Sequence, residues 1–118
     1  MKWKVEYTDE FGEWWETLTE DEQESIAVSV ELLETMGPNL PRPHSDTIKG
    51  SKFKNMKELR TQHAGKPFRT LYAFDPRRAA ILLIGGNKEG NNNWYKTFVP
   101  FADKLFEQHL KDLENEEG

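Results

Sequence analysis

The chain of 118 residues contains no cysteine, which excludes disulfide bonds, zinc–thiolate sites and thiol nucleophiles. Its longest apolar run, residues 79–84, is far shorter than the roughly 20 residues that span a bilayer. The first residues alternate between polar and apolar and do not form the apolar segment of a signal peptide. We therefore expect a soluble, cytoplasmic protein with no membrane partner. The length predicts a single domain, residues 1–118.

Common motifs of cofactor and metal enzymes are also missing. The sequence has no P-loop, no G-x-S-x-G, no H-E-x-x-H and no G-x-G-x-x-G. Its three histidines, His44, His63 and His109, are too dispersed to form a metal site by local spacing. We therefore expect neither a metal nor a cofactor.

Charge is segregated along the chain. Residues 1–40 carry a net charge of -9, residues 41–100 carry +8 and residues 101–118 carry -4, which gives -5 overall. A basic middle between acidic ends suggests a local face that binds a polyanion. Charges that only coat a solvated surface would give the same pattern, so charge alone does not decide between the two.

Apolar spacing in the first third predicts a short strand and two helices. Residues 3–7 alternate as in a strand with one buried face. Apolar residues at helical spacing predict helices over residues 9–18 and 20–36, the second with a capping box formed by Thr19 and Glu22. Together the helices form an αα-hairpin whose apolar stripes need a third surface to cover them.

The remainder predicts a sheet and a final helix. Residues 54–61, 68–74 and 79–85 are strand-like, and a type I turn joins the last two. Residues 38–51, with three prolines, predict a loop, and a helix is expected over residues 102–113, with Pro100 at its start or at a kink in a longer helix. The predicted fold class is α+β: an N-terminal strand and an αα-hairpin packed on a small sheet of four antiparallel strands, followed by a C-terminal helix.

Cations and aromatic residues of the middle third are the candidates for chemistry. Neighbouring strands would bring Arg60 and Arg69 together beside the glycine-rich loop that carries Lys88. Cleaving RNA without a metal requires activation of a ribose 2′-OH, protonation of the leaving 5′-oxygen and cations around the phosphorus. Plainer roles are open for the same residues: the arginines could pair with Glu58 or with the acidic helices, and aromatic residues before a helix could belong to the core.

Five ordered segments resemble the phage-derived HigB-like toxins of the RelE/ParE superfamily. They are D-T-I-K-G-S at 46–51, K-E-L-R at 57–60, R-T-L-Y-A-F-D-P at 69–76, G-G-N-K at 85–88 and W-Y at 94–95. The resemblance implies a compact α+β toxin of a type II toxin–antitoxin system. It also implies a neighbouring helix-turn-helix antitoxin as partner, and metal-free cleavage of mRNA on the translating ribosome.

The same resemblance suggests residue roles. Arg69 is similar to the arginine that contacts the scissile phosphate, and the other catalytic candidates are Glu58, Arg60, His63, Lys88 and Tyr95. Candidates for RNA binding are Lys49, Lys57, Trp94 and Lys96.

One departure from the pattern concerns the second strand. Well-studied RelE members have lysines there on the face of the arginine, where this chain has Met56 and Glu58, with Lys57 on the opposite face. Glu58 could be a base or a sign of weakened activity. A non-enzymatic, ParE-like inhibitor of a topoisomerase and a module that binds only its antitoxin are therefore the alternatives.

Overall fold

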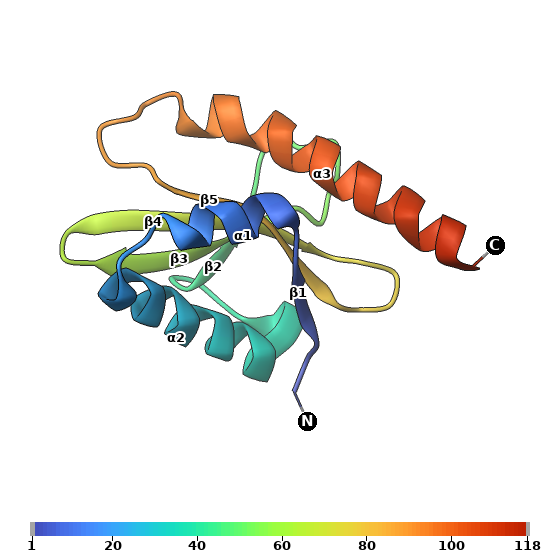
Figure 1. Ribbon diagram of the computed structural model, residues 1–118, viewed down its shortest axis with the longest axis horizontal. Coiled ribbons are helices and arrows are strands. Elements are labelled where there is room, and N and C mark those ends of the chain that lie inside the picture. Colours follow the sequence, from blue (N-terminus) through green and yellow to red (C-terminus); the bar gives the residue numbers. More distant parts are fainter. Residues whose placement is uncertain (1, 118) are drawn as a thin grey trace.

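The computed structural model describes residues 2–117, which form a five-stranded sheet with helices on both faces (Figure 1). The strand order across the sheet is β1-β5-β4-β3-β2. In chain order the elements are β1 (Val5–Tyr7), α1 (Asp9–Glu16), α2 (Glu20–Met36), the 3-10 helix η1 (Gly37–Asn39), β2 (Ser45–Thr47), β3 (Lys57–His63), β4 (Lys66–Phe74), β5 (Ala80–Asn87) and α3 (Trp94–Glu117). The α+β prediction is confirmed.

Local capping explains why the two N-terminal helices start and stop where they do. The Thr8 hydroxyl oxygen caps α1 by accepting from the Phe11 N–H at 3.0 Å. The predicted capping box of α2 is present, with Thr19 and Glu22 each accepting from the other's backbone N–H. The α2 helix ends at Met36 and is capped by Gly37, which has φ of 58° and where an added Cβ would clash with the Trp3 ring.

The expectation of four antiparallel strands is wrong at both edges of the sheet. The first strand pairs with β5 in parallel, with Val5 opposite Ala80. The predicted loop over residues 38–51 contains β2, which pairs antiparallel with β3. Alternation in β1 predicts neither the partner nor the direction, and the expectation of one buried face is wrong at Tyr7, which is 67% exposed. Three residues of β2 are too few for a periodic signal.

Each face of the sheet has its own apolar core. On one face Phe11 of α1 and Leu33 of α2 pack with Leu59 of β3. On the other face Met56, Leu71 and Leu83 pack with residues of α3, among them Val99 and Phe106. Alternation along β3 therefore turns Leu59 toward α2, and its neighbours Glu58 and Arg60 toward α3.

The sequence allowed either a C-terminal helix that starts at Pro100 or a longer helix that contains Pro100, and the structure has the longer helix. It begins at Trp94, and Pro100 lies inside it, where the proline lacks the N–H that would bond one turn back. Buried Trp94, Val99 and Ala102 hold this stretch against the sheet, and their packing outweighs the lost hydrogen bond.

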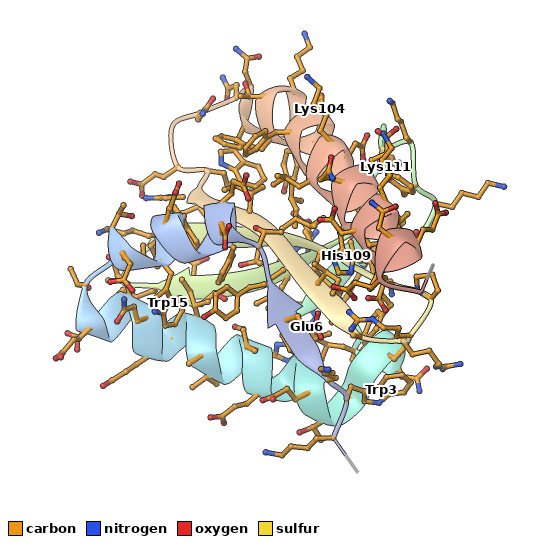
Figure 2. The ribbon with its side chains drawn as sticks, turned by 45° about the vertical axis from the view of Figure 1, so that its right-hand side comes forward. Trp3, Glu6, Trp15, Lys104, His109 and Lys111 are labelled. Carbon is orange, nitrogen blue, oxygen red and sulfur yellow. The ribbon has the colours of Figure 1, made fainter. Side chains whose placement is uncertain are left out.

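Polar contacts fix the far half of α3. His109 Nε2 lies 2.9 Å from the fully buried Asp75 carboxylate, which Arg77 links to Glu6 of β1 (Figure 2). The cluster therefore joins α3 to the β4–β5 turn and to the sheet edge. Over residues 2–117, no helix combines the length and apolar character needed to cross a membrane.

Candidate active site

A buried carboxylate lies at the centre of the candidate site. Glu58 is 3% exposed, and its Oε1 accepts from the Tyr95 hydroxyl at 2.6 Å. Its Oε2 accepts from Arg60 Nε at 3.0 Å, and Arg69 Nε lies 3.5 Å from Oε1. A buried charge is tolerated only when it is paired and hydrogen-bonded, and the three neighbours supply both conditions.

Strand register places these side chains together. Arg60 of β3 is directly opposite Arg69 of β4, and Glu58 precedes Arg60 by one strand repeat on the same face. The first turn of α3 brings Tyr95 over this face because Trp94 packs on Gly86, where a Cβ would lie 2.5 Å from the indole nitrogen. We refer to Glu58, Arg60, Arg69 and Tyr95 as the Glu58 cluster.

Lys88 adds a further cation beside the cluster. It follows β5 in the glycine-rich loop, and its Nζ lies 5.5 Å from the centroid of the Tyr95 ring. The structure thus brings cations from β3, from β4 and from the loop after β5 to one end of α3.

Arg60 also pairs with a second carboxylate, that of Asp46, which was not among the candidates predicted from the sequence. Its Nη2 lies 3.2 Å from Asp46 Oδ2 of β2, and Arg42 Nε lies 3.2 Å from the same oxygen. The backbone N–H of Thr47 and the charge of Arg42 and Arg60 lower the Asp46 pKa below its usual value. Only the pairing of β2 with β3 brings Asp46 to Arg60, and no sequence signal predicted that strand.

Burial sets the protonation of Tyr95. Burial and then the hydrogen bond to Glu58 raise the pKa of the Tyr95 phenol above its usual value. Burial lowers the Arg60 pKa, but the hydrogen bond to Glu58 and the charges of Glu58 and Asp46 raise it more, so the net shift is upward. At neutral pH Tyr95 is therefore a proton donor and Arg60 a permanent cation.

The two arginines differ in how fully they are satisfied. The Arg69 side chain is 13% exposed, and its Nη1 donates to the Phe68 carbonyl at 3.0 Å. Its buried Nε makes no hydrogen bond with any part of the chain that the structure describes. Arg60 is 33% exposed and is shared between Glu58 and Asp46. An anion would compete with one carboxylate, Glu58, for Arg69 and with two, Glu58 and Asp46, for Arg60.

Two sequence candidates lie away from the cluster, and a third, Trp94, is buried beside it with its ring centroid 5.2 Å from that of Tyr95. His63 is on the α2 side of β3, where its Nδ1 is 2.7 Å from Ser25 Oγ. Lys57 is on that side too, with Nζ 3.5 Å from the Pro38 carbonyl. Trp94 is 2% exposed, so its ring is core and has no face free for a base. Alternation from Arg60 already places His63 on the opposite face, so the sequence could have excluded it from the site.

Two further candidates, Lys49 and Lys96, are exposed. Lys49 follows β2, and Lys96 lies in the first turn of α3. Within residues 2–117, no group of three or more metal-ligating side chains is arranged to hold a metal ion.

The fold is similar to that of solved RelE structures. A double mutant of Escherichia coli toxin RelE in the free state superposes with a TM-score of 0.57 at 9% identity, covering 80% of this chain and 92% of that one. An archaeal RelE–RelB complex from Pyrococcus horikoshii OT3 gives a TM-score of 0.55 at 16% identity, covering 76% of this chain and 99% of the matched chain.

Sequence comparison narrows the class to a family. Residues 13–107 match the family model described as "Phage derived protein Gp49-like (DUF891)". "Putative toxin HigB3" of Mycobacterium tuberculosis strain H37Rv is 47% identical over 98 residues, covering 82% of this chain and 84% of the relative. "Putative toxin HigB2" of the same strain is 42% identical over 104 residues, covering 86% of this chain but 52% of the relative, about half its length. The chain belongs to the Gp49-like family, and its resemblance to HigB-like toxins is confirmed.

Proposed function

We propose that this chain is the toxin of a type II toxin–antitoxin pair and that it cleaves mRNA on the translating ribosome without a metal. The observation that carries the proposal is the meeting of Arg60, Arg69 and Tyr95 around Glu58, with Lys88 beside them. The two Mycobacterium tuberculosis relatives, both named as toxins, support the toxin class.

In the proposed reaction the phosphate enters between the arginines. Guanidinium offers a fixed fork of donors to phosphate oxygens, and Arg69 faces a single carboxylate, that of Glu58. Arg60 turns from Glu58 toward the phosphate, which leaves Glu58 Oε2 free to accept a proton. Lys88 adds positive charge where negative charge develops on the phosphoryl oxygens.

Proton transfer then follows from the two oxygens of Glu58. The ribose 2′-OH loses its proton to Oε2 and its oxygen attacks the phosphorus, while the bond from phosphorus to the 5′-oxygen breaks. Tyr95 protonates the leaving 5′-oxygen. Rotation of the Glu58 carboxyl group then brings the proton on Oε2 to the Tyr95 phenolate oxygen, which lies 2.6 Å from Oε1 in the structure, and restores both groups. The products are a 2′,3′-cyclic phosphate and a 5′-hydroxyl end. His63 has no part in this scheme because it lies on the opposite face of β3.

The ion pairs of the Glu58 cluster favour a second candidate function. Arg60 and Arg69 both face carboxylates of the chain itself, as expected if they only stabilise the fold. The chain would then be a non-enzymatic inhibitor of the ParE type, acting on a topoisomerase, or a module that binds only its antitoxin.

Cleavage assays on purified ribosomes separate the candidates. For the nuclease we expect Arg69→Ala to lose mRNA cleavage and toxicity, while the matched control Arg78→Ala, at the exposed β4–β5 turn, keeps both. Toxicity that survives Arg69→Ala and Lys88→Ala together would favour the inhibitor and contradict the nuclease. Far-UV circular dichroism of each variant shows whether the fold is kept.

We also propose a helix-turn-helix antitoxin as partner and the cytoplasm as the site of action. The RelE of Pyrococcus horikoshii was solved as a complex with RelB, which supports a protein partner for this chain. Co-expression with the product of the adjacent reading frame should give a stable complex and abolish toxicity. Separate elution of the two products on size-exclusion chromatography would contradict the pairing.

A further inference from the structure

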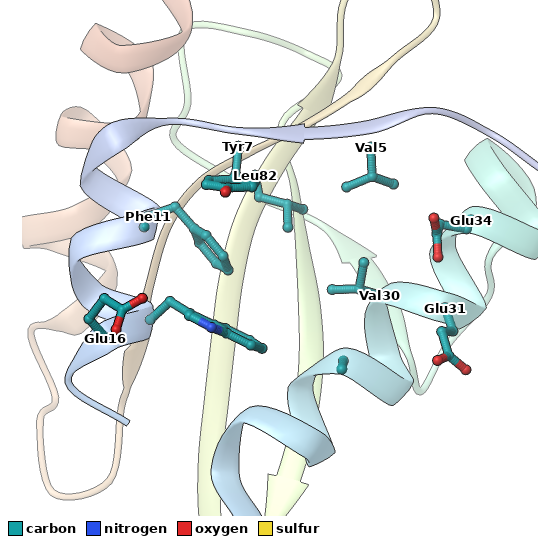
Figure 3. A pocket seen from close by; sticks show the side chains of 11 residues that line it. Val5, Tyr7, Phe11, Glu16, Val30, Glu31, Glu34 and Leu82 are labelled. Carbon is teal, nitrogen blue, oxygen red and sulfur yellow. The ribbon is translucent and has the colours of Figure 1, made fainter. Parts of the chain in front are cut away.

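A groove of about 490 Å³ lies between α1 and α2, on the face of the sheet opposite α3 (Figure 3). Each of the four elements around it contributes a large apolar side chain, namely Val5 of β1, Phe11 of α1, Val30 of α2 and Leu82 of β5. Glu58 and Tyr95 lie on the other face, beneath the first turn of α3. A molecule in the groove is therefore separated from the Glu58 cluster by the sheet.

The chain itself leaves the apolar surface of this groove incompletely covered. Where the two helices border the groove they carry Gly12 and Ala27, and side chains this small do not fill the space between the helices. Tyr7 is 67% exposed at the groove, and Trp15 is only partly buried. A concave apolar surface with exposed aromatic side chains is typical of a site where another protein binds.

The charged side chains that line the groove are all negative. They are Glu16 of α1 and Glu31 and Glu34 of α2, and no Lys or Arg lines it. Within residues 2–117, none of the three carboxylates forms an ion pair with a side chain of the chain itself. Glu31 and Glu34 are one helical turn apart, where like charges repel each other. A partner with cations at these positions would relieve the repulsion, whereas the phosphates of RNA would increase it.

The length of the groove limits the size of its occupant. Its lining residues on α2 extend from Ala27 to Glu34, a rise of about 10 Å at 1.5 Å per residue. This distance equals about two turns of a helix. An amphipathic helix places apolar residues one turn apart on one side, which is how such helices dock into grooves between elements of a partner. Lys or Arg next to those apolar residues would reach the glutamates of the groove.

We infer that this groove binds a short amphipathic helix of a partner protein, with apolar residues on the side that enters the groove and Lys or Arg beside them. The inference goes beyond the proposed reaction, because the surface is separate from the Glu58 cluster and its binding does not require cleavage of mRNA. A second copy of this chain and a small apolar molecule are the competing occupants.

A designed peptide tests the groove by fluorescence anisotropy. The probe is a fluorescein-labelled helix of about four turns, with leucines one turn apart on one side and lysines beside them. A second probe has glutamate in place of each lysine. The wild-type chain should bind the lysine probe at least about tenfold more tightly than the glutamate probe. Equal binding of both probes would show a purely apolar site and overturn the inference.

Charge reversal in the groove separates docking from general attraction to an acidic protein. The double variant Glu31→Lys with Glu34→Lys should weaken binding of the lysine probe by at least about tenfold, because two attractive contacts become repulsive. The control Glu114→Lys with Glu116→Lys makes the same change in net charge at the exposed end of α3 and should keep most of the affinity. Equal losses in the two double variants would overturn the inference.

Filling the groove tests its shape. Ala27→Trp should abolish binding of the lysine probe, while the control Val28→Trp, at a neighbouring position that is 58% exposed and outside the groove, should retain it. Far-UV circular dichroism shows whether each variant keeps its fold. A dimer of the wild-type chain in light scattering that Ala27→Trp dissociates would identify a second copy as the occupant and overturn the inference.

NMR of the wild-type chain locates the probe. The lysine probe should shift the Trp15 indole and Val30 methyl signals and leave the Tyr95 ring signals in place. Shifts at Tyr95 without shifts at Trp15 would place the peptide at the Glu58 cluster and overturn the inference. If the probe binds in the groove but the chain never cleaves mRNA, the proposed function fails while the docking surface stands.

Discussion

Replacing Glu58 by glutamine should change stability, RNA affinity and cleavage in three different ways. Glutamine keeps an oxygen for the Tyr95 hydroxyl but removes the charge that Arg60 and Arg69 face. Breaking a buried ion pair costs about 3 to 5 kcal/mol. We expect about 3 kcal/mol, the lower figure, because Asp46 still pairs with Arg60.

In Glu58→Gln, the affinity for RNA should rise while the rate of cleavage falls. Without Glu58 the two guanidinium groups no longer share their charge with a neighbouring carboxylate, so affinity for a short RNA should rise by about fivefold, or about 1 kcal/mol. The proton acceptor is lost, so single-turnover cleavage should fall by at least about 100-fold, a typical contribution of a general base.

Three measurements on Glu58→Gln follow these effects. Urea unfolding monitored by tryptophan fluorescence gives the free energy of unfolding, fluorescence anisotropy gives RNA affinity, and rapid quench on ribosome-bound mRNA gives cleavage. Glu89→Gln, in the exposed loop, is the matched control for loss of one carboxylate. Cleavage by Glu58→Gln at the rate of this control would refute the proposed role of Glu58 as the base.

Three further changes probe other parts of the structure. Asp46→Asn should raise RNA affinity several-fold by anisotropy, because Asp46 competes with phosphate for Arg60; unchanged affinity would contradict that competition. Burial raises the Asp75 pKa, but hydrogen bonds from His109 and Arg77 lower it more, so stability is present above about pH 4 and is lost as pH falls through the lowered pKa. Asp75→Asn should therefore cost about 3 kcal/mol at pH 7 and flatten the acid limb of urea unfolding. Gly86→Ala should lower the melting temperature and cleavage together, since its Cβ would lie 2.5 Å from the Trp94 ring; a wild-type melting curve would contradict this.

The N-terminal helices and the β4–β5 hairpin could be predicted from the sequence because each depends on residues that are close together in the chain. Thr19 and Glu22 form the predicted capping box, and β4 and β5 pair across the predicted turn. The direction of β1 could not be predicted from the sequence. Its partner β5 lies more than 70 residues later in the chain, and side chains alternate in the same way in parallel and antiparallel strands.

The candidate site was predictable where strand alternation and register decide it. Arg60 and Arg69 were expected on neighbouring strands, and the structure pairs them directly. Asp46 was not predicted as part of the site because β2, the strand that brings it to Arg60, has only three residues and gives no periodic signal. The burial of Trp94 depends on the helix beginning before Pro100, which is a matter of tertiary packing against Gly86.

The proposed chemistry can be tested most directly by mapping RNA ends after induction of the wild-type chain, with and without active translation. We expect new 5′-hydroxyl ends and 2′,3′-cyclic phosphates within translated messages, and their absence when initiation is blocked or when Arg69→Ala is induced. Cuts that continue without translation would contradict the ribosome-dependent mechanism. Toxic wild-type chains that leave every message intact would contradict cleavage itself.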